Sequence, residues 1–125
     1  MAQRSLVVAI VDDEIAVRRA LGRLLMAAGL ESEVFSSAEE FLHRSSDKSP
    51  DCLILDVRLP GMSGLELQRQ PAADHDRTPI LFVTSHDDPG SRASALRAGA
   101  IAFLLKPFTE EALLEAIRSA IGGSK

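Results

Sequence analysis

The stretch CLILDVRLPGMSG, residues 52–64, decides the fold. Four apolar residues lead directly into Asp56, and a Pro-Gly pair follows shortly afterwards. A continuous apolar run that ends in turn residues is typical of a strand covered on both faces, as in a parallel sheet. We therefore interpret residues 52–55 as a buried strand that delivers a carboxylate at its carboxyl end.

Other parts of the chain repeat this pattern of strand followed by helix. Further strands are predicted at residues 6–11, 80–83 and 101–105, with a weaker edge strand at 31–35. Helical spacing or start signals follow each of them, at residues 14–28, after Ser37, after Ser63, at 88–98 and after Thr109. This alternation predicts a doubly wound α/β domain with right-handed crossovers. Among such domains we expect the flavodoxin-like form, a five-stranded parallel sheet of order 2-1-3-4-5 with five helices.

Helix boundaries have their own signals. Ser37 and Ser63 each open an S-x-x-E capping box, and Gly29 and Gly99 stand where glycines end helices. The helix after Ser63 is expected to be short, because a proline at position 71 cannot continue it. The helix at 88–98 has only one large apolar residue, Leu96, so we expect Leu96 to anchor it and the helix to be loosely held.

Composition limits the function. The 125 residues are 46% hydrophobic and 26% charged, with a net charge of −4 and no basic run, which argues against direct nucleic-acid binding. Cys52 is the single cysteine, so no internal disulfide can form and a reducing compartment is expected. The first residues resemble neither a signal peptide nor a membrane span. We expect a cytoplasmic protein without membrane association, with one domain over residues 1–122 and a tail or linker start at 123–125.

Polar side chains follow four of the predicted strands. They are Asp12 and Asp13, then Asp56, then Thr84, then Lys106. Open α/β sheets bind ligands outside the carboxyl ends of their strands, so these groups are expected to meet. Crowded carboxylates favour a hard cation such as Mg²⁺, and a lysine suits a phosphoryl oxygen. Aspartate can itself be phosphorylated, so the set predicts phosphoryl transfer to Asp56.

Four motifs, at residues 11–14, 55–64, 83–85 and 105–108, resemble the receiver domain of two-component response regulators along essentially the whole chain. The resemblance implies that Asp56 accepts phosphate from a sensor histidine kinase. It implies Mg²⁺ ligands from Asp12, Asp13, Asp56 and the carbonyl of Arg58, with Thr84 and Lys106 contacting the phosphoryl group. It also suggests a cis peptide bond between Lys106 and Pro107.

The same resemblance assigns secondary roles. Phe103 would change rotamer as phosphate draws Thr84 inward, and the helix at 88–98 would shift with it. Arg58 and His86 border the phosphoryl site, and we expect them to restrict an attacking water and so tune the phosphate lifetime. The chain resembles receivers that are joined to helix-turn-helix transcription factors. Once phosphorylated, such receivers typically form homodimers through the face that contains the fourth helix and the fifth strand. The DNA-binding domain would have been removed or never present.

Several alternatives stay open at this point. The Asp12–Asp13 pair taken alone fits a solvated turn, Thr84 fits a strand-end hydroxyl, and Phe103 fits an ordinary core residue. An aspartate-nucleophile phosphohydrolase would share the chemistry, although its first strand would carry D-x-D. A flavodoxin-type binding module would need a phosphate loop where residues 12–14 are acidic. A receiver that acts unphosphorylated, as an interaction domain, is the third alternative.

Overall fold

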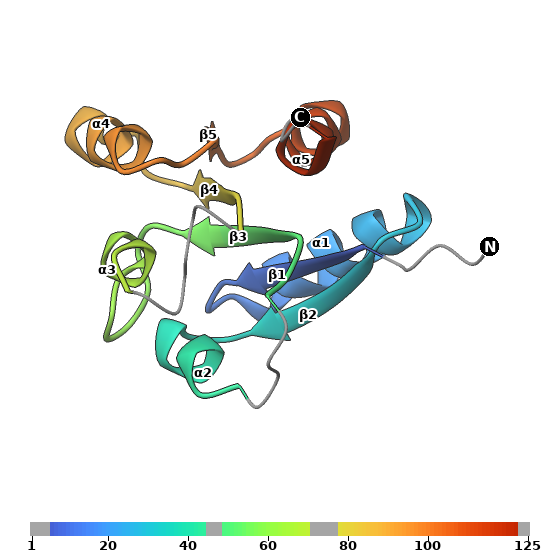
Figure 1. Cartoon of the computed structure of the whole chain (residues 1–125), viewed down its shortest axis with the longest axis horizontal. Coiled ribbons are helices and arrows are strands. Elements are labelled where there is room, and N and C mark those ends of the chain that lie inside the picture. Colours follow the sequence, from blue (N-terminus) through green and yellow to red (C-terminus); the bar gives the residue numbers. More distant parts are fainter. Residues whose placement is uncertain (1–5, 45–48, 71–77, 123–125) are drawn as a thin grey trace.

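The computed structural model describes residues 6–44, 49–70 and 78–122. Strands and helices alternate five times along the chain (Figure 1). The elements are β1 (Val7–Val11), α1 (Ile15–Ala27), β2 (Glu31–Phe35), α2 (Ala38–Leu42), β3 (Cys52–Asp56), α3 (Gly64–Gln68), β4 (Ile80–Thr84), α4 (Pro89–Arg97), β5 (Ala102–Leu105) and α5 (Glu110–Gly122). Residues 71–77, which follow the short helix predicted after Ser63, lie outside the described residues. The predicted tail at 123–125 lies outside them as well.

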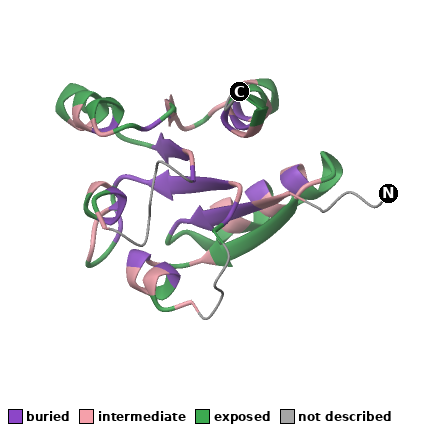
Figure 2. Cartoon of the chain, viewed as in Figure 1, coloured by how far each residue is buried: buried purple, intermediate pink, exposed green. Residues whose placement is uncertain are grey.

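All five strands pair in parallel in the order β2-β1-β3-β4-β5, which confirms the predicted doubly wound topology. The central strands β3 and β4 are buried throughout, whereas four of the five residues of β2 are exposed (Figure 2). The apolar runs of β1, β3 and β4 therefore became interior strands, and residues 31–35 became an edge strand, as predicted. The apolar run at 101–105 became β5, which lies at the other edge and is mostly half-buried.

Each face of the sheet has its own hydrophobic core. Alternate strand residues point to opposite faces, so Leu53 and Leu55 pack toward α2, α3 and α4, while Cys52 and Ile54 pack toward α1 and α5. Figure 1 shows the same division of helices between the two faces. Cys52 is fully buried, and burial raises the pKa of its thiol to about 12, which fits a core residue.

The helix signals are largely confirmed. Ser37 and Ser63 accept hydrogen bonds from the backbone three residues on, and Ser63 with Glu66 completes a capping box. At Ser37 the box is incomplete, because the Glu40 carboxylate accepts the N–H of Ser36 instead. Gly29 has the positive φ, 83°, of a residue that ends a helix.

The expected anchor of α4 was wrong. Leu96 is 45% exposed, and the buried residue of this helix is its neighbour Ala95. The buried amide of Gln68, from α3, donates to the Ala95 carbonyl over 3.0 Å. The face of α4 that carries Ala95 therefore packs against α3. Among the described residues, no helix is long and apolar enough to cross a membrane.

Candidate functional site

The carboxyl ends of β1, β3, β4 and β5 lie side by side at one edge of the sheet (Figure 1). Asp12 follows β1, Asp56 ends β3, Thr84 ends β4 and Lys106 follows β5. Because these strands are parallel neighbours, their last residues share this edge. The convergence predicted from the sequence is therefore confirmed at the level of the backbone.

Asp12 is fully buried, and hydrogen bonds hold it between the end of β1 and the start of α1. Its Oδ1 accepts the Glu14 N–H over 2.9 Å, and its own N–H donates to the Phe35 carbonyl of β2 over 3.1 Å. Arg18, one turn into the helix, donates to the Asp12 carbonyl over 2.8 Å. These bonds hold the Asp12 backbone and Oδ1, while Oδ2 faces Lys106.

Three carboxylates meet at this edge. Asp12, Asp13 and Asp56 each offer an oxygen, and the three oxygens lie within 4.8 Å of one another. Asp12 and Asp56 are buried and Asp13 is exposed. A set made only of oxygen donors and open on one side fits a hard divalent cation such as Mg²⁺, which retains some of its own water.

Lys106 lies between the carboxylates. Its Nζ is 2.8 Å from Asp12 Oδ2, 3.0 Å from Asp56 Oδ2 and 3.5 Å from Glu14 Oε1. Burial disfavours the ammonium, but the hydrogen bonds and negative charges of Asp12 and Asp56 prevail and raise the pKa of Lys106 to about 12. Glu14 belonged to a motif in the sequence, but nothing in the sequence marked its contact with Lys106. The Lys106–Pro107 peptide bond is cis, as predicted.

Asp56 is in an environment that disfavours its charge. It is 6% exposed, and this burial is the main cause that raises its pKa above the ordinary value. The hydrogen bond from Lys106 and the Arg58 N–H, 3.0 Å from Oδ1, offset part of that effect. A bound cation would offset the negative charge of this buried carboxylate.

Thr84 and Phe103 lie on one face of two neighbouring strands. The Thr84 carbonyl accepts the Lys106 N–H over 2.7 Å, and its hydroxyl accepts the His86 N–H over 3.3 Å. Phe103 pairs in register with Phe82, two residues before Thr84, and the two rings are 6.0 Å apart. Strand alternation therefore places Thr84 on the Phe103 side of the sheet. Phe103 is 9% exposed, and the Arg92 guanidinium of α4 lies 5.3 Å from its ring.

Arg58 and His86 are exposed residues of the two loops that flank Asp56. The hydrogen bonds of Ser91 and Gly90 lower the pKa of Asp88 most, and the charge of Arg58 adds a small further lowering. Arg58 lies in the β3–α3 loop and His86 in the β4–α4 loop.

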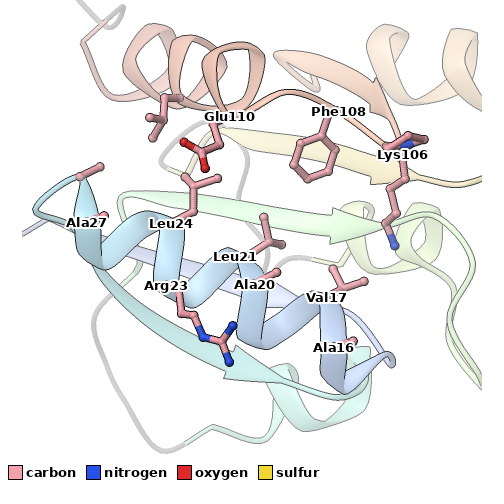
Figure 3. Close-up of a pocket in the computed structure, with 13 residues that line it drawn as sticks. Ala16, Val17, Ala20, Leu21, Arg23, Leu24, Ala27, Lys106, Phe108 and Glu110 are labelled. Carbon is pink, nitrogen blue, oxygen red and sulfur yellow. The ribbon is translucent and has the colours of Figure 1, made fainter.

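An open groove of about 800 Å³ runs between α1 and α5, with Lys106 at one end (Figure 3). Its lining is mainly apolar and includes Val17, Leu21, Leu24, Phe108 and Leu114. The groove was not predicted from the sequence. Spacing along one helix does not tell how far apart two helices lie.

A doubly wound sheet with acidic side chains and a lysine at its carboxyl edge is consistent with a phospho-accepting signalling domain. A family model, the response regulator receiver domain, matches residues 8–118. The chain belongs to this family. A receiver domain is a signalling module rather than a turnover enzyme, and a two-component receiver implies a cognate histidine kinase as partner.

Individual relatives agree with the family. The response regulator protein TodT of Pseudomonas putida is 46% identical over 121 residues, which are 97% of this chain and 53% of TodT. The DNA-binding transcriptional regulator NtrC of Escherichia coli is 36% identical over 115 residues, which are 92% of this chain and 24% of NtrC. The chain spans about half the length of the first of these relatives.

Solved structures of response regulators also have folds similar to that of this chain. A low-resolution structure of response regulator StyR has a TM-score of 0.83 and 48% identity, covering 95% of this chain and 60% of that one. The crystal structure of FixJ-N has a TM-score of 0.83 and 36% identity, covering 96% of both chains. The domain is therefore a two-component receiver related to transcription regulators.

Proposed function

We propose that Asp56 accepts a phosphoryl group from the phosphohistidine of a sensor kinase, or from a small phosphodonor. An Asp56 carboxylate oxygen attacks phosphorus, the P–N bond of the phosphohistidine breaks, and the imidazole leaves with the bonding pair and takes up a proton. Later attack of water on phosphorus releases inorganic phosphate and restores the carboxylate. The observation that carries this proposal is the position of buried Asp56 between Lys106 Nζ, 3.0 Å away, and the oxygens of Asp12 and Asp13.

The proposed cation is Mg²⁺, held by Asp12, Asp13, Asp56 and the Arg58 carbonyl. The donor chemistry supports it, because all these ligands are oxygens and the carboxylates lie within 4.8 Å of each other. When bound, the ion offsets negative charge on the phosphoryl oxygens. Lys106 supplies a fixed ammonium for one phosphoryl oxygen, and the Thr84 hydroxyl would exchange its local bond to the His86 N–H for another.

The proposed switch joins Thr84 to Phe103. Movement of Thr84 toward the phosphoryl group frees space on the sheet face that Phe103 shares. A Phe ring has no hydroxyl to anchor either rotamer, so packing against Phe82 and Arg92 governs the change. Because α4 buries little besides Ala95, it can shift with the ring. Leu96 and Ile101, both exposed, belong to the α4–β5 face proposed to form the phosphorylated homodimer.

Arg58 and His86 are proposed to tune the phosphate lifetime by restricting the attacking water. The exposed positions of both residues in the loops that flank Asp56 support this role. The receiver is proposed to span residues 1–122 and to act on a DNA-binding domain that lies outside this chain, as the length of the relatives suggests.

Intact mass spectrometry tests the central step. The protein is incubated with acetyl phosphate and Mg²⁺, with an EDTA-treated sample and the Asp56→Asn variant as controls. We expect one phosphoryl adduct on the parent protein and none on either control. Steady turnover of simple phosphomonoesters would favour the phosphohydrolase instead. No adduct under any condition would favour the interaction domain that acts unphosphorylated.

A further inference from the structure

A residue of α2 holds the loop between β3 and α3 close to the start of α3. Glu39, in the first turn of α2, accepts the Met62 N–H over 2.9 Å, although the two residues are 23 positions apart. Gly61 has a φ of 74°, and a Cβ built there would lie 2.6 Å from Glu39 Oε2. The carboxylate is therefore in contact with the backbone of this loop.

The contact between Glu39 and the loop has the features of a strong hydrogen bond. The Met62 N–H is the largest cause that lowers the pKa of Glu39, so the acceptor is ionised near neutral pH. Hydrogen bonds to ionised acceptors are roughly twice as strong as neutral ones. The positive φ of Gly61 disfavours a side chain at that position, and its backbone lets the Glu39 carboxylate approach closely.

The ends of the same loop are fixed by other bonds. At its start, the Arg58 N–H donates to Asp56 Oδ1 over 3.0 Å. At its end, Ser63 and Glu66 form the capping box of α3. The Gly64 N–H also donates to the Val57 carbonyl over 2.9 Å and so joins the two ends of the loop. Glu39 adds a further attachment, from a separate helix, between the acceptor strand and the start of α3.

We propose that Glu39 is a positioning residue, which holds the β3–α3 loop so that the backbone of Arg58 stands beside Asp56. It touches neither the phosphoryl group nor the cation and acts through the loop. The purpose of this positioning rests on the proposed function, because the Arg58 carbonyl is one of the proposed Mg²⁺ ligands. The attachment of the loop itself does not depend on that function.

The neighbouring residue provides a matched control. Glu40 lies in the same turn of α2 and carries the same charge, but its carboxylate accepts the N–H of Ser36, four residues away. Both acids interact alike with the helix dipole. Removing Glu40 therefore reports any general loss of α2 stability, whereas removing Glu39 also releases the loop.

Amide hydrogen exchange by NMR, on protein without Mg²⁺, tests the attachment directly. In Glu39→Ala we expect the Met62 amide hydrogen to exchange about tenfold faster than in the parent protein. We also expect the NMR chemical shift of the Arg58 amide to change. Glu39→Gln keeps an acceptor oxygen of the same reach and should recover part of the protection. Glu40→Ala should leave Met62 as in the parent. Unchanged Met62 exchange in Glu39→Ala, or equal acceleration in Glu40→Ala, would overturn the proposal.

Phosphorylation by acetyl phosphate then tests what the attachment does. We expect Glu39→Ala to need several-fold more Mg²⁺ for half-maximal rate, with the rate at saturating Mg²⁺ much less affected. Glu39→Gln should fall between, and Glu40→Ala should match the parent. A parent protein that takes up no phosphate would contradict the proposed function, while the exchange of Met62 would still decide the attachment. An unchanged Mg²⁺ requirement in Glu39→Ala would overturn the positioning role.

Discussion

Gly64 lies so close to Asp56 that a Cβ atom on Gly64 would collide with the Asp56 carbonyl oxygen. The same Cβ would be 3.2 Å from the ring of Phe82. Helix α3 thus begins in direct backbone contact with the strand end that carries the proposed acceptor. A glycine is required here for space, because position 64 has no positive φ.

Gly64→Ala should therefore destabilise the protein by about 1–3 kcal/mol, as overpacking does, and slow phosphorylation by displacing Asp56. Gly22→Ala is the matched control, because Gly22 lies within α1 and a Cβ there meets only Ser32 Oγ at 3.7 Å. That substitution should stabilise by about 0.5–1 kcal/mol. Urea unfolding measures both. A Gly64→Ala protein as stable and as readily phosphorylated as Gly22→Ala would contradict the close contact.

Arg92 covers the ring of Phe103, with 5.3 Å between the guanidinium carbon and the ring centre. Arg92→Ala should lower the free energy of unfolding by about 0.5–1 kcal/mol and make the Phe103 ring more mobile. Aromatic ¹³C relaxation of Phe103 measures that mobility. Arg97→Ala changes another exposed arginine of α4 and should leave the ring unaffected. Equal ring mobility in both variants would show that Arg92 does not govern the switch residue.

Lys106 should make stability depend on alkaline pH. Its pKa is raised from 10.5 to about 12, so its stabilising effect is complete below pH 10.5 and is lost as pH rises toward 12. The full loss amounts to about 2 kcal/mol. The buried Cys52 thiol, with its pKa also raised, adds a loss of its own above pH 9.0.

Comparison with Lys106→Met separates the two groups, because both proteins retain Cys52. Urea unfolding from neutral pH to about pH 11.5 should show the stability difference between parent and variant shrinking above pH 10.5. A difference that stays constant across this range would contradict the ion pairs of Lys106 with Asp12 and Asp56.

The sequence was sufficient for the sheet and for the edge where the polar groups meet. Apolar runs such as residues 52–55 specify buried strands, and parallel strands bring their carboxyl ends together. That rule alone placed Asp56 near Lys106, 50 positions away. The local hydrogen bonds at Ser63 and the positive φ of Gly29 follow from short-range patterns of the same kind.

Contacts made by helices from outside their own segment were not predictable in this way. Leu96 was expected inside because it is large, yet Ala95 is the buried residue and its carbonyl accepts a hydrogen bond from Gln68 of α3. Glu39 is one of two adjacent acidic residues, and the sequence around them does not show which of the two contacts Met62. Such contacts depend on how far apart the elements lie, which spacing along the chain does not record.

The central claim is that Asp56, rather than Asp12 or Asp13, carries the phosphoryl group. Borohydride reduces an aspartyl phosphate to homoserine, and peptide mapping by tandem mass spectrometry then identifies the modified residue. After incubation with acetyl phosphate and Mg²⁺, we expect homoserine at position 56 and unmodified aspartate at positions 12 and 13. Homoserine at position 12 or 13, or at none of the three, would contradict the account.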